Sequence, residues 1–196
     1  MITQADGFRL ILEVFDLLEI PYQVVGSLAS SMHGIPRATM DVDIVADLRT
    51  DQIVEFVGQL KADFYADAEM ITEALARQRS FNLIHYASSY KFDIFPLARD
   101  EYSQTQFGRR QFSETKSLGD PIECAVASAE DTILNKLRWY RLGGETSERQ
   151  WNDLRGVVRV QGSALDLSYL NTWAPKLGVS DLLERLLNED RPCVEP

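Results

Sequence analysis

The sequence contains little that would support a disulfide framework, a zinc site or a membrane anchor. It has 2 cysteines and 2 histidines in 196 residues, and Cys124, Cys193, His33 and His85 are too scattered to show zinc-ligand spacing. The same scatter gives no support to a Ser-His-Asp or Cys-His catalytic arrangement, so we expect all four to be structural or incidental. No apolar run has the length that crosses a bilayer, and the N-terminus lacks a basic start followed by an apolar block. We therefore expect a cytoplasmic protein.

Basic residues are also scarce. The chain has 20 Lys and Arg against 30 Asp and Glu, a formal net charge of −10 and a pI of about 4.7. An acidic surface repels phosphate backbones, so we expect no extended nucleic-acid groove. A single nucleotide remains compatible with this charge because bound divalent cations reverse the local sign. A small local patch that grips an RNA end is compatible with it as well.

Hydrophobic residues make up 45% of the chain, which is enough for a packed core. Apolar periodicity predicts helices over 7–18, 28–33, 50–60 with Thr50 as its cap, and 67–78, and strands over 22–25, 42–46, 81–87 and 91–95. One or two short strands are expected within 109–126. Four helices follow, over 128–142, 147–160, 166–177 and 180–187, the first capped by Ser128 and stopped by Gly143. The pattern indicates an α+β fold, with a mixed-sheet core over 1–126 and a helical segment over 127–196.

Paired acids in the second predicted strand carry the main chemical signal. Asp41 and Asp43 are two residues apart, so in a strand their carboxylates point to the same face. A third acid, Asp93, sits between apolar residues in a later strand. Like charges this close favour a cation between them, and hard oxygen ligands suit Mg²⁺ or Mn²⁺. Three such carboxylates could hold two metals for in-line displacement at phosphorus, whereas an isolated Asp-x-Asp is usually a turn or a solvated edge.

The Gly26-Ser27 pair falls where the first predicted strand turns into a helix. Free backbone N–H groups at a helix start bind phosphate, and glycine allows the phosphate to approach the backbone closely. The hydroxyl of Ser27 can add a hydrogen bond, although it could equally serve only as a helix cap.

Together these residues resemble the polymerase-β-like nucleotidyltransferase superfamily. Its motif is Gly-Gly or Gly-Ser, a spacer of about this length, Asp-hydrophobic-Asp, and a third acid in a later strand, matched here by Gly26, Ser27, Asp41, Asp43 and Asp93. The segment over 37–43 is similar to the Arg-x-Thr-x-Asp-x-Asp of tRNA-nucleotidyltransferase-type enzymes and of the AbiEii-type toxin branch.

The resemblance to the AbiEii-like branch extends to two later segments. Lys136, in the predicted helix over 128–142, matches a lysine that is thought to face the triphosphate there. Asp153 matches an Arg-x-x-x-Asp-Leu motif, here over 149–154. The implied fold is a nucleotidyltransferase-type mixed sheet with flanking helices. The implied activity moves a nucleoside monophosphate from an NTP to a hydroxyl of an RNA such as tRNA, a protein or a small molecule. A toxin role with an antitoxin partner stays open.

The resemblance also implies a role for each site residue. The metal-binding and catalytic set, for Mg²⁺ or Mn²⁺, is Asp41, Asp43 and Asp93, of which Asp93 also helps to remove the proton of the acceptor hydroxyl. The nucleotide-binding set is Gly26, Ser27, Arg37, Lys136 and Asp153.

Two other functions stay open. A glycosyltransferase that uses Asp-x-Asp to hold a metal and a sugar nucleotide would leave the Gly-Ser turn and the third acid unexplained. A non-catalytic nucleotide-binding or regulatory module with the same fold would have no need of all three acids. The two predicted nucleotide-binding cations also have a non-functional interpretation. Arg37 would then be a charge on a surface loop, and Lys136 would be a solvated helix residue.

Overall fold

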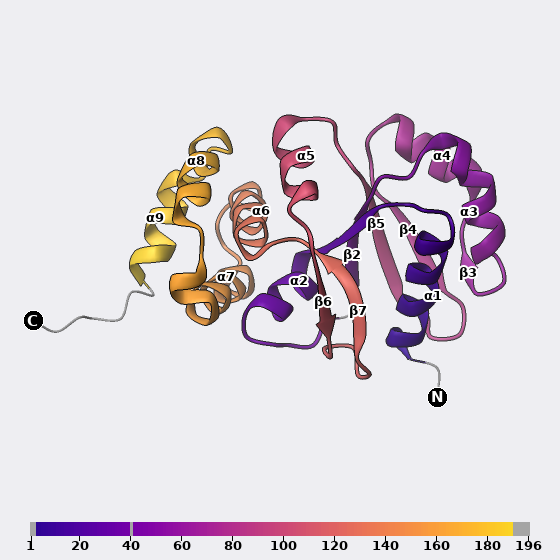
Figure 1. The fold of residues 1–196 in the computed structure, drawn as a ribbon, viewed down its shortest axis with the longest axis horizontal. Helices are drawn as coiled ribbons and strands as arrows, with labels where there is room; N and C mark the ends of the chain where they lie inside the picture. Colours follow the sequence, from indigo (N-terminus) through magenta and orange to yellow (C-terminus); the bar gives the residue numbers. More distant parts are fainter. Residues whose placement is uncertain (1–2, 40, 190–196) are drawn as a thin grey trace, which may run out of the picture. The chain divides into compact units, whose positions relative to one another are not determined.

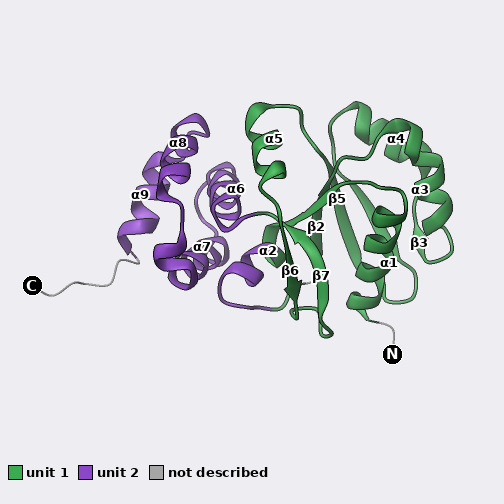
Figure 2. Cartoon of the chain, in the orientation of Figure 1, with its two compact units in different colours: residues 1–28, 38–127 green, residues 29–37, 128–196 purple. Residues whose placement is uncertain are grey.

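The computed structural model describes residues 3–39 and 41–189, and its contacts divide the chain into two compact units (Figure 2). Residues 1–28 and 38–127 form the first, which we call the sheet unit, and residues 29–37 and 128–196 form the second, the helical unit. Each unit is built from two segments that are separate in the sequence. The boundary near residue 28 falls inside a helix. Each unit carries one part of the chemistry predicted from the sequence.

The sheet unit combines strands and helices that alternate along the chain up to β4, and the pairs β4–β5 and β6–β7 follow one another without a helix between their strands (Figure 1). Its strands are β1 (Tyr22–Val25), β2 (Asp41–Ala46), β3 (Phe64–Tyr65), β4 (Phe81–His85), β5 (Lys91–Pro96), β6 (Gln111–Thr115) and β7 (Ile122–Val126). Its helices are α1 (Gln4–Leu17), the start of α2 (Gly26–His33), the 3₁₀ turn η1 (Thr50–Gln52), α3 (Ile53–Leu60), α4 (Ala68–Ala76) and α5 (Glu101–Gly108).

The described strands form one seven-stranded sheet in the order β3-β4-β5-β2-β1-β7-β6. The pairs β2–β5 and β1–β7 are parallel, whereas β1–β2, β3–β4, β4–β5 and β6–β7 are antiparallel. The sheet is therefore mixed, as the sequence predicts. The crossover that makes β2 and β5 parallel neighbours decides the geometry of the acidic residues.

One face of the central strands is the hydrophobic core of the sheet unit. Val42 and Ile44 of β2 and Phe92 of β5 are fully buried. Phe8 of α1 stacks on Phe92 with ring centroids 6.4 Å apart, and further aromatic stacking continues along α1 and α3. Because side chains alternate along a strand, burying this face leaves the intervening residues of β2 and β5 on the opposite face.

The helical unit is made of α6 (Ala129–Leu142), α7 (Glu148–Gln161), the 3₁₀ turn η2 (Gly162–Ala164), α8 (Leu167–Lys176) and α9 (Ser180–Glu189), with the end of α2. The backbone N–H of Asp131 donates to Ser128 Oγ at 3.1 Å, which caps α6 as predicted. Leu134, Leu137, Leu154 and Leu170 are fully buried between these helices. The α+β class with C-terminal helices is thus confirmed. In the described residues, no helix combines the length and apolarity that crossing a bilayer requires.

Three local features of the structure differ from the predicted elements, and one of them is the two-residue strand β3, which no predicted strand covers. Thr50 does not cap α3; it opens η1, and the turn is closed by Gln52 Oε1, which accepts from the Arg49 N–H at 3.1 Å. Helix α5 has no counterpart in the predicted elements. Its sequence is largely polar and lacks an apolar stripe, so its main local signal is Asp100, whose carboxylate accepts from the Ser103 N–H at 2.9 Å.

Candidate active site

The three predicted acids lie on neighbouring strands of the sheet. In the β2–β5 pairing Asp43 is directly opposite Asp93, and Asp41 is two residues before Asp43 on β2. Directly paired residues share a face, and neighbouring strands are about 4.8 Å apart, so all three acids occupy the face opposite the core. We call this face of β2 and β5 the acidic face. It is open to solvent: Asp41 is exposed, and Asp43 and Asp93 are partly buried.

A fourth charged residue on this face, Lys91, is not among the site residues predicted from the sequence. It is paired with Asp41 across β2–β5, and its Nζ lies 3.0 Å from Oδ2 of Asp93. The pKa of Lys91 is raised, mainly by this contact with Asp93, and the charges of Asp41 and Asp43 add to the effect. Its ammonium is therefore in the field of all three carboxylates. Its position two residues before Asp93 is the only signal in the sequence that it shares their face.

The strand-to-helix turn at Gly26 packs directly against the acidic face. Strand β1 ends at Val25, which is paired with Asp43, and α2 begins at Gly26. Gly26 has φ +63°, and a Cβ placed on it would lie 2.0 Å from Oδ2 of Asp43. Both the backbone conformation and the space therefore require glycine. The turn brings the N-terminus of α2, with Ser27 as its second residue, beside the carboxylate of Asp43.

The other three predicted residues meet inside the helical unit. Arg37 donates to both oxygens of Asp153, with Nε–Oδ1 at 2.6 Å and Nη2–Oδ2 at 2.7 Å, and Lys136 Nζ lies 2.8 Å from Oδ2. We call these three residues the ion cluster. The side chains of Lys136 and Asp153 are only 9% and 7% exposed, so Lys136 is not a solvated helix residue. Arg37, at 24%, is likewise held rather than free in a loop.

Burial acts to raise the pKa of Asp153, but hydrogen bonds from Arg37 and Lys136 outweigh it, so the pKa is lowered. The carboxylate therefore stays ionised and carries two cations at once. The three side chains of the ion cluster have a formal net charge of +1. A buried arrangement of this kind can either stabilise the fold or position the cations for an anion.

Close packing against α7 holds the loop that carries Arg37. A Cβ on Gly34 would lie 2.7 Å from the backbone N of Val157, so the loop after α2 touches the α7 backbone. The N–H of Arg37 also bonds to Ser31 Oγ at 3.5 Å. These contacts place Arg37 beside Asp153, although the two residues are 116 positions apart in the chain.

The donor set of the acidic face suits a hard divalent cation, although no group of three His, Cys, Asp or Glu side chains in the described residues is arranged as a ready-made metal site. Two features support the fit. Lys91, a cation, already lies 3.0 Å from Oδ2 of Asp93, and Gly26 leaves room for the carboxylate of Asp43 on this face, which a side chain at position 26 would displace. Carboxylate oxygens are the ligands that Mg²⁺ and Mn²⁺ prefer.

The buried residues Cys124 and His85 offer no chemistry that competes with this site. Cys124 is fully buried, and burial raises its pKa to about 12, so its thiol is inert. His85 is 2% exposed, and its Nδ1 lies 2.7 Å from Ser88 Oγ, which is a structural role. Cys193 lies outside the described residues.

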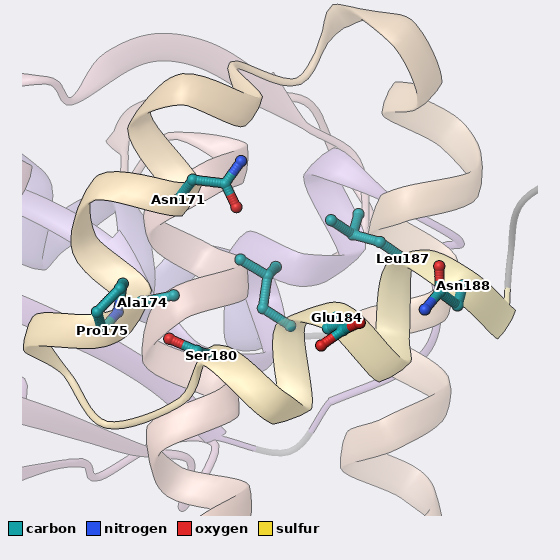
Figure 3. Close-up of a pocket in the computed structure, with 8 residues that line it drawn as sticks. Asn171, Ala174, Pro175, Ser180, Glu184, Leu187 and Asn188 are labelled. Atoms are coloured by element: carbon teal, nitrogen blue, oxygen red, sulfur yellow. The ribbon is translucent and has the colours of Figure 1, made fainter.

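The helical unit also has a cavity of about 320 Å³ between α8 and α9 (Figure 3). Its polar lining comes from Asn171, Ser180, Glu184 and Asn188, and its apolar lining includes Leu183 and Leu187. None of the predicted site residues lines it, and its chemistry points to no particular ligand.

The likeness of this chain to known proteins lies in its fold. No protein-family model and no curated protein matches it. Among solved structures, it is similar to an antigenic nucleotidyltransferase-like protein from Paracoccidioides brasiliensis, with 14% identity, 98% of this chain and 96% of that chain covered, and a TM-score of 0.51. It is also similar to the antibiotic-resistance factor ANT(2'')-Ia, with 16% identity, coverage of 91% and 95%, and a TM-score of 0.50.

A third structure, the lincosamide antibiotic adenylyltransferase LnuA with lincomycin bound, has 18% identity, coverage of 81% and 98%, and a TM-score of 0.49. The first two similarities, with TM-scores of 0.51 and 0.50, show the fold alone. The nucleotidyltransferase-type fold is therefore confirmed over nearly the whole chain, whereas the AbiEii branch stays a prediction.

Proposed function

We propose that the protein is a nucleotidyltransferase that moves a nucleoside monophosphate from an NTP to a hydroxyl group and releases pyrophosphate. The observation that carries the proposal is the acidic face: Asp43 is paired with Asp93 across two parallel strands, Asp41 shares their face, and the α2 turn abuts Asp43. A phosphate-binding helix start beside clustered carboxylates is what in-line displacement at phosphorus needs.

In this proposal, the α2 turn binds the outer phosphates. The first backbone N–H groups of a helix have no intrahelical partner and carry a partial positive charge. Gly26 lets a phosphate oxygen come close, and Ser27 offers its hydroxyl. The turn thereby fixes the triphosphate next to the carboxylates and aligns the α-phosphorus for attack.

Asp41, Asp43 and Asp93 would hold Mg²⁺ or Mn²⁺. The bound cation would neutralise charge on the triphosphate and on the departing pyrophosphate. Asp93 lies at the outer strand of the group, and we assign it the acceptor side. There its carboxylate takes the proton of the acceptor hydroxyl as that oxygen bonds to the α-phosphorus, and the bond from the α-phosphorus to the bridging oxygen breaks so that pyrophosphate leaves.

The resemblance assigns Arg37, Lys136 and Asp153 to the nucleotide, and the ion cluster that they form in the helical unit supports this assignment. The two cations Arg37 and Lys136 and the one carboxylate of Asp153 have a formal net charge of +1. The shared carboxylate holds both cations in place. Arg37 matches phosphate through its planar donors, and Lys136 acts as a point charge. Asp153 is a positioning residue in this scheme.

The acceptor is a hydroxyl of an RNA such as tRNA, a protein or a small molecule. The net charge of −10 disfavours a long nucleic-acid track, so an RNA acceptor would be gripped at its end. An AbiEii-like toxin role, with an antitoxin that blocks the acidic face, is part of the same proposal and rests on the resemblance over residues 37–43.

One labelling experiment tests the proposal. The protein is incubated with each α-³²P-labelled NTP and Mg²⁺ or Mn²⁺, and with total tRNA, a protein mixture or aminoglycoside and lincosamide antibiotics, which represent the three acceptor classes. Label should move to one class with wild type and with Asp51→Asn, an exposed aspartate of η1. It should not move with Asp43→Asn. Metal-dependent NTP binding without any transfer would favour the non-catalytic module, and turnover of a UDP-sugar would favour the glycosyltransferase.

A further inference from the structure

Lys91 gives the acidic face a cation of its own. Its Nζ is 3.0 Å from Oδ2 of Asp93, and the Asp93 side chain is only 17% exposed, so this contact is partly shielded from water. Across the β2–β5 pairing Lys91 is opposite Asp41. Three carboxylates and one ammonium leave a formal charge of −2, which a single divalent cation balances.

We propose that Lys91 is an internal counter-ion that competes with a divalent cation for Asp93, so that metal binding requires the Lys91 ammonium to leave this carboxylate. The inference rests on the proposed function, because it assigns Asp93 to the metal.

The geometry permits the displacement. Lys91 is the first residue of β5, and its side chain is 43% exposed, so the ammonium can swing into solvent on its flexible stem without disturbing the core. In the metal-free protein, the same ammonium offsets repulsion between the acids. Its effect is therefore opposite in the two states: it stabilises the free acidic face and weakens the binding of a metal.

The test measures binding of Mn²⁺ alone, by electron paramagnetic resonance, to wild type, Lys91→Met and Lys91→Arg. Methionine keeps the stem and removes the charge, and we expect it to tighten Mn²⁺ binding about threefold, since an ion pair of this exposure contributes less than one decade in affinity. Lys91→Arg keeps the charge and should bind as wild type does. Thermal melting adds a second readout, in which Mn²⁺ should raise the melting temperature of Lys91→Met more than that of wild type.

Lys116→Met is the matched control. Lys116 lies two residues after Glu114 at the end of β6, with Nζ 3.4 Å from the carboxylate, so it repeats the two-residue spacing of Lys91 and Asp93 on another strand. It should leave Mn²⁺ affinity unchanged. Equal affinity in Lys91→Met and wild type, with binding lost in Asp43→Asn, would overturn this inference and leave the proposed function standing. If neither wild type nor Lys91→Met binds Mn²⁺, the inference and the metal part of the proposed function both fail.

Discussion

Replacing Gly26 by alanine places a Cβ atom 2.0 Å from Oδ2 of Asp43. Real Cβ atoms do not approach other heavy atoms closer than about 3.0 Å, so the carboxylate has to move by about 1 Å. The substitution also forces alanine into the left-handed region at φ +63°, which costs about 1–2 kcal/mol. Gly26→Ala therefore changes two quantities, the stability of the fold and the position of Asp43.

Gly144→Ala separates the two effects. Gly144 follows α6 at φ +73°, and no atom lies within 4 Å of the position that a Cβ would take there, so this variant carries the backbone cost without the steric contact. We expect both variants to lose about 1–2 kcal/mol in the free energy of unfolding in urea. Only Gly26→Ala should also lose about 100-fold in nucleotidyl transfer, because a misplacement of about 1 Å has that effect on a reacting group.

The assays are urea unfolding for stability and the rate of label transfer for activity. If Gly26→Ala and Gly144→Ala transferred label equally fast, the turn would not be part of the site. If Gly26→Ala were as stable as wild type, the left-handed conformation assigned to residue 26 would be wrong.

Three further predictions concern charge. Asp43→Asn removes one of several like charges, so in metal-free buffer its free energy of unfolding should stay within about 1 kcal/mol of wild type or rise; a large loss would show that Asp43 is structural. Lys136→Ala breaks a buried ion pair and should cost about 3 kcal/mol, whereas Arg141→Ala, in an exposed pair with Asp181, should cost less than about 1 kcal/mol; equal melting temperatures would contradict the burial of Lys136. Because the pKa of Asp153 is lowered, the stability it contributes is full above its ordinary value of 3.8 and is lost as the pH falls through its lowered pKa. The gap in unfolding free energy between wild type and Asp153→Asn should therefore be widest near pH 7 and narrow below pH 4, and a gap that does not change with pH would refute the assignment.

Local patterns in the sequence are sufficient to predict the central strands of the sheet and most helices, whereas the two-residue edge strand β3 is too short to give a pattern. The sequence pattern predicts strands over 42–46 and 91–95 with the acids on one face, and the structure has them over 41–46 and 91–96; the Ser128 cap predicts the start of α6. These features depend on residues close together in the chain, so periodicity and capping chemistry reveal them. The polar helix α5 has no apolar stripe, and the 3₁₀ turn at Thr50 resembles an ordinary helix start, which explains why periodicity misses the first and misassigns the second.

Contacts between distant segments cannot be derived in this way. Motifs indicate Arg37, Lys136 and Asp153 one by one, but their meeting at one carboxylate depends on the loop after α2 packing on α7 at Gly34. The role of Lys91 likewise depends on β2 and β5 being neighbours, which the sequence alone does not specify.

The measurement that tests the central claim most directly is the rate of pyrophosphate release from the preferred NTP, with Mg²⁺ or Mn²⁺ and the acceptor identified by labelling. Wild type and Asp51→Asn should release pyrophosphate at the same rate, and chelation of the metal should stop both. Asp43→Asn, paired with Asp93 on the acidic face, should be about 1,000-fold slower while it stays folded, since loss of one metal ligand removes several kcal/mol of transition-state stabilisation. Release by Asp43→Asn at the wild-type rate would contradict the assignment of the active site to this face of the sheet.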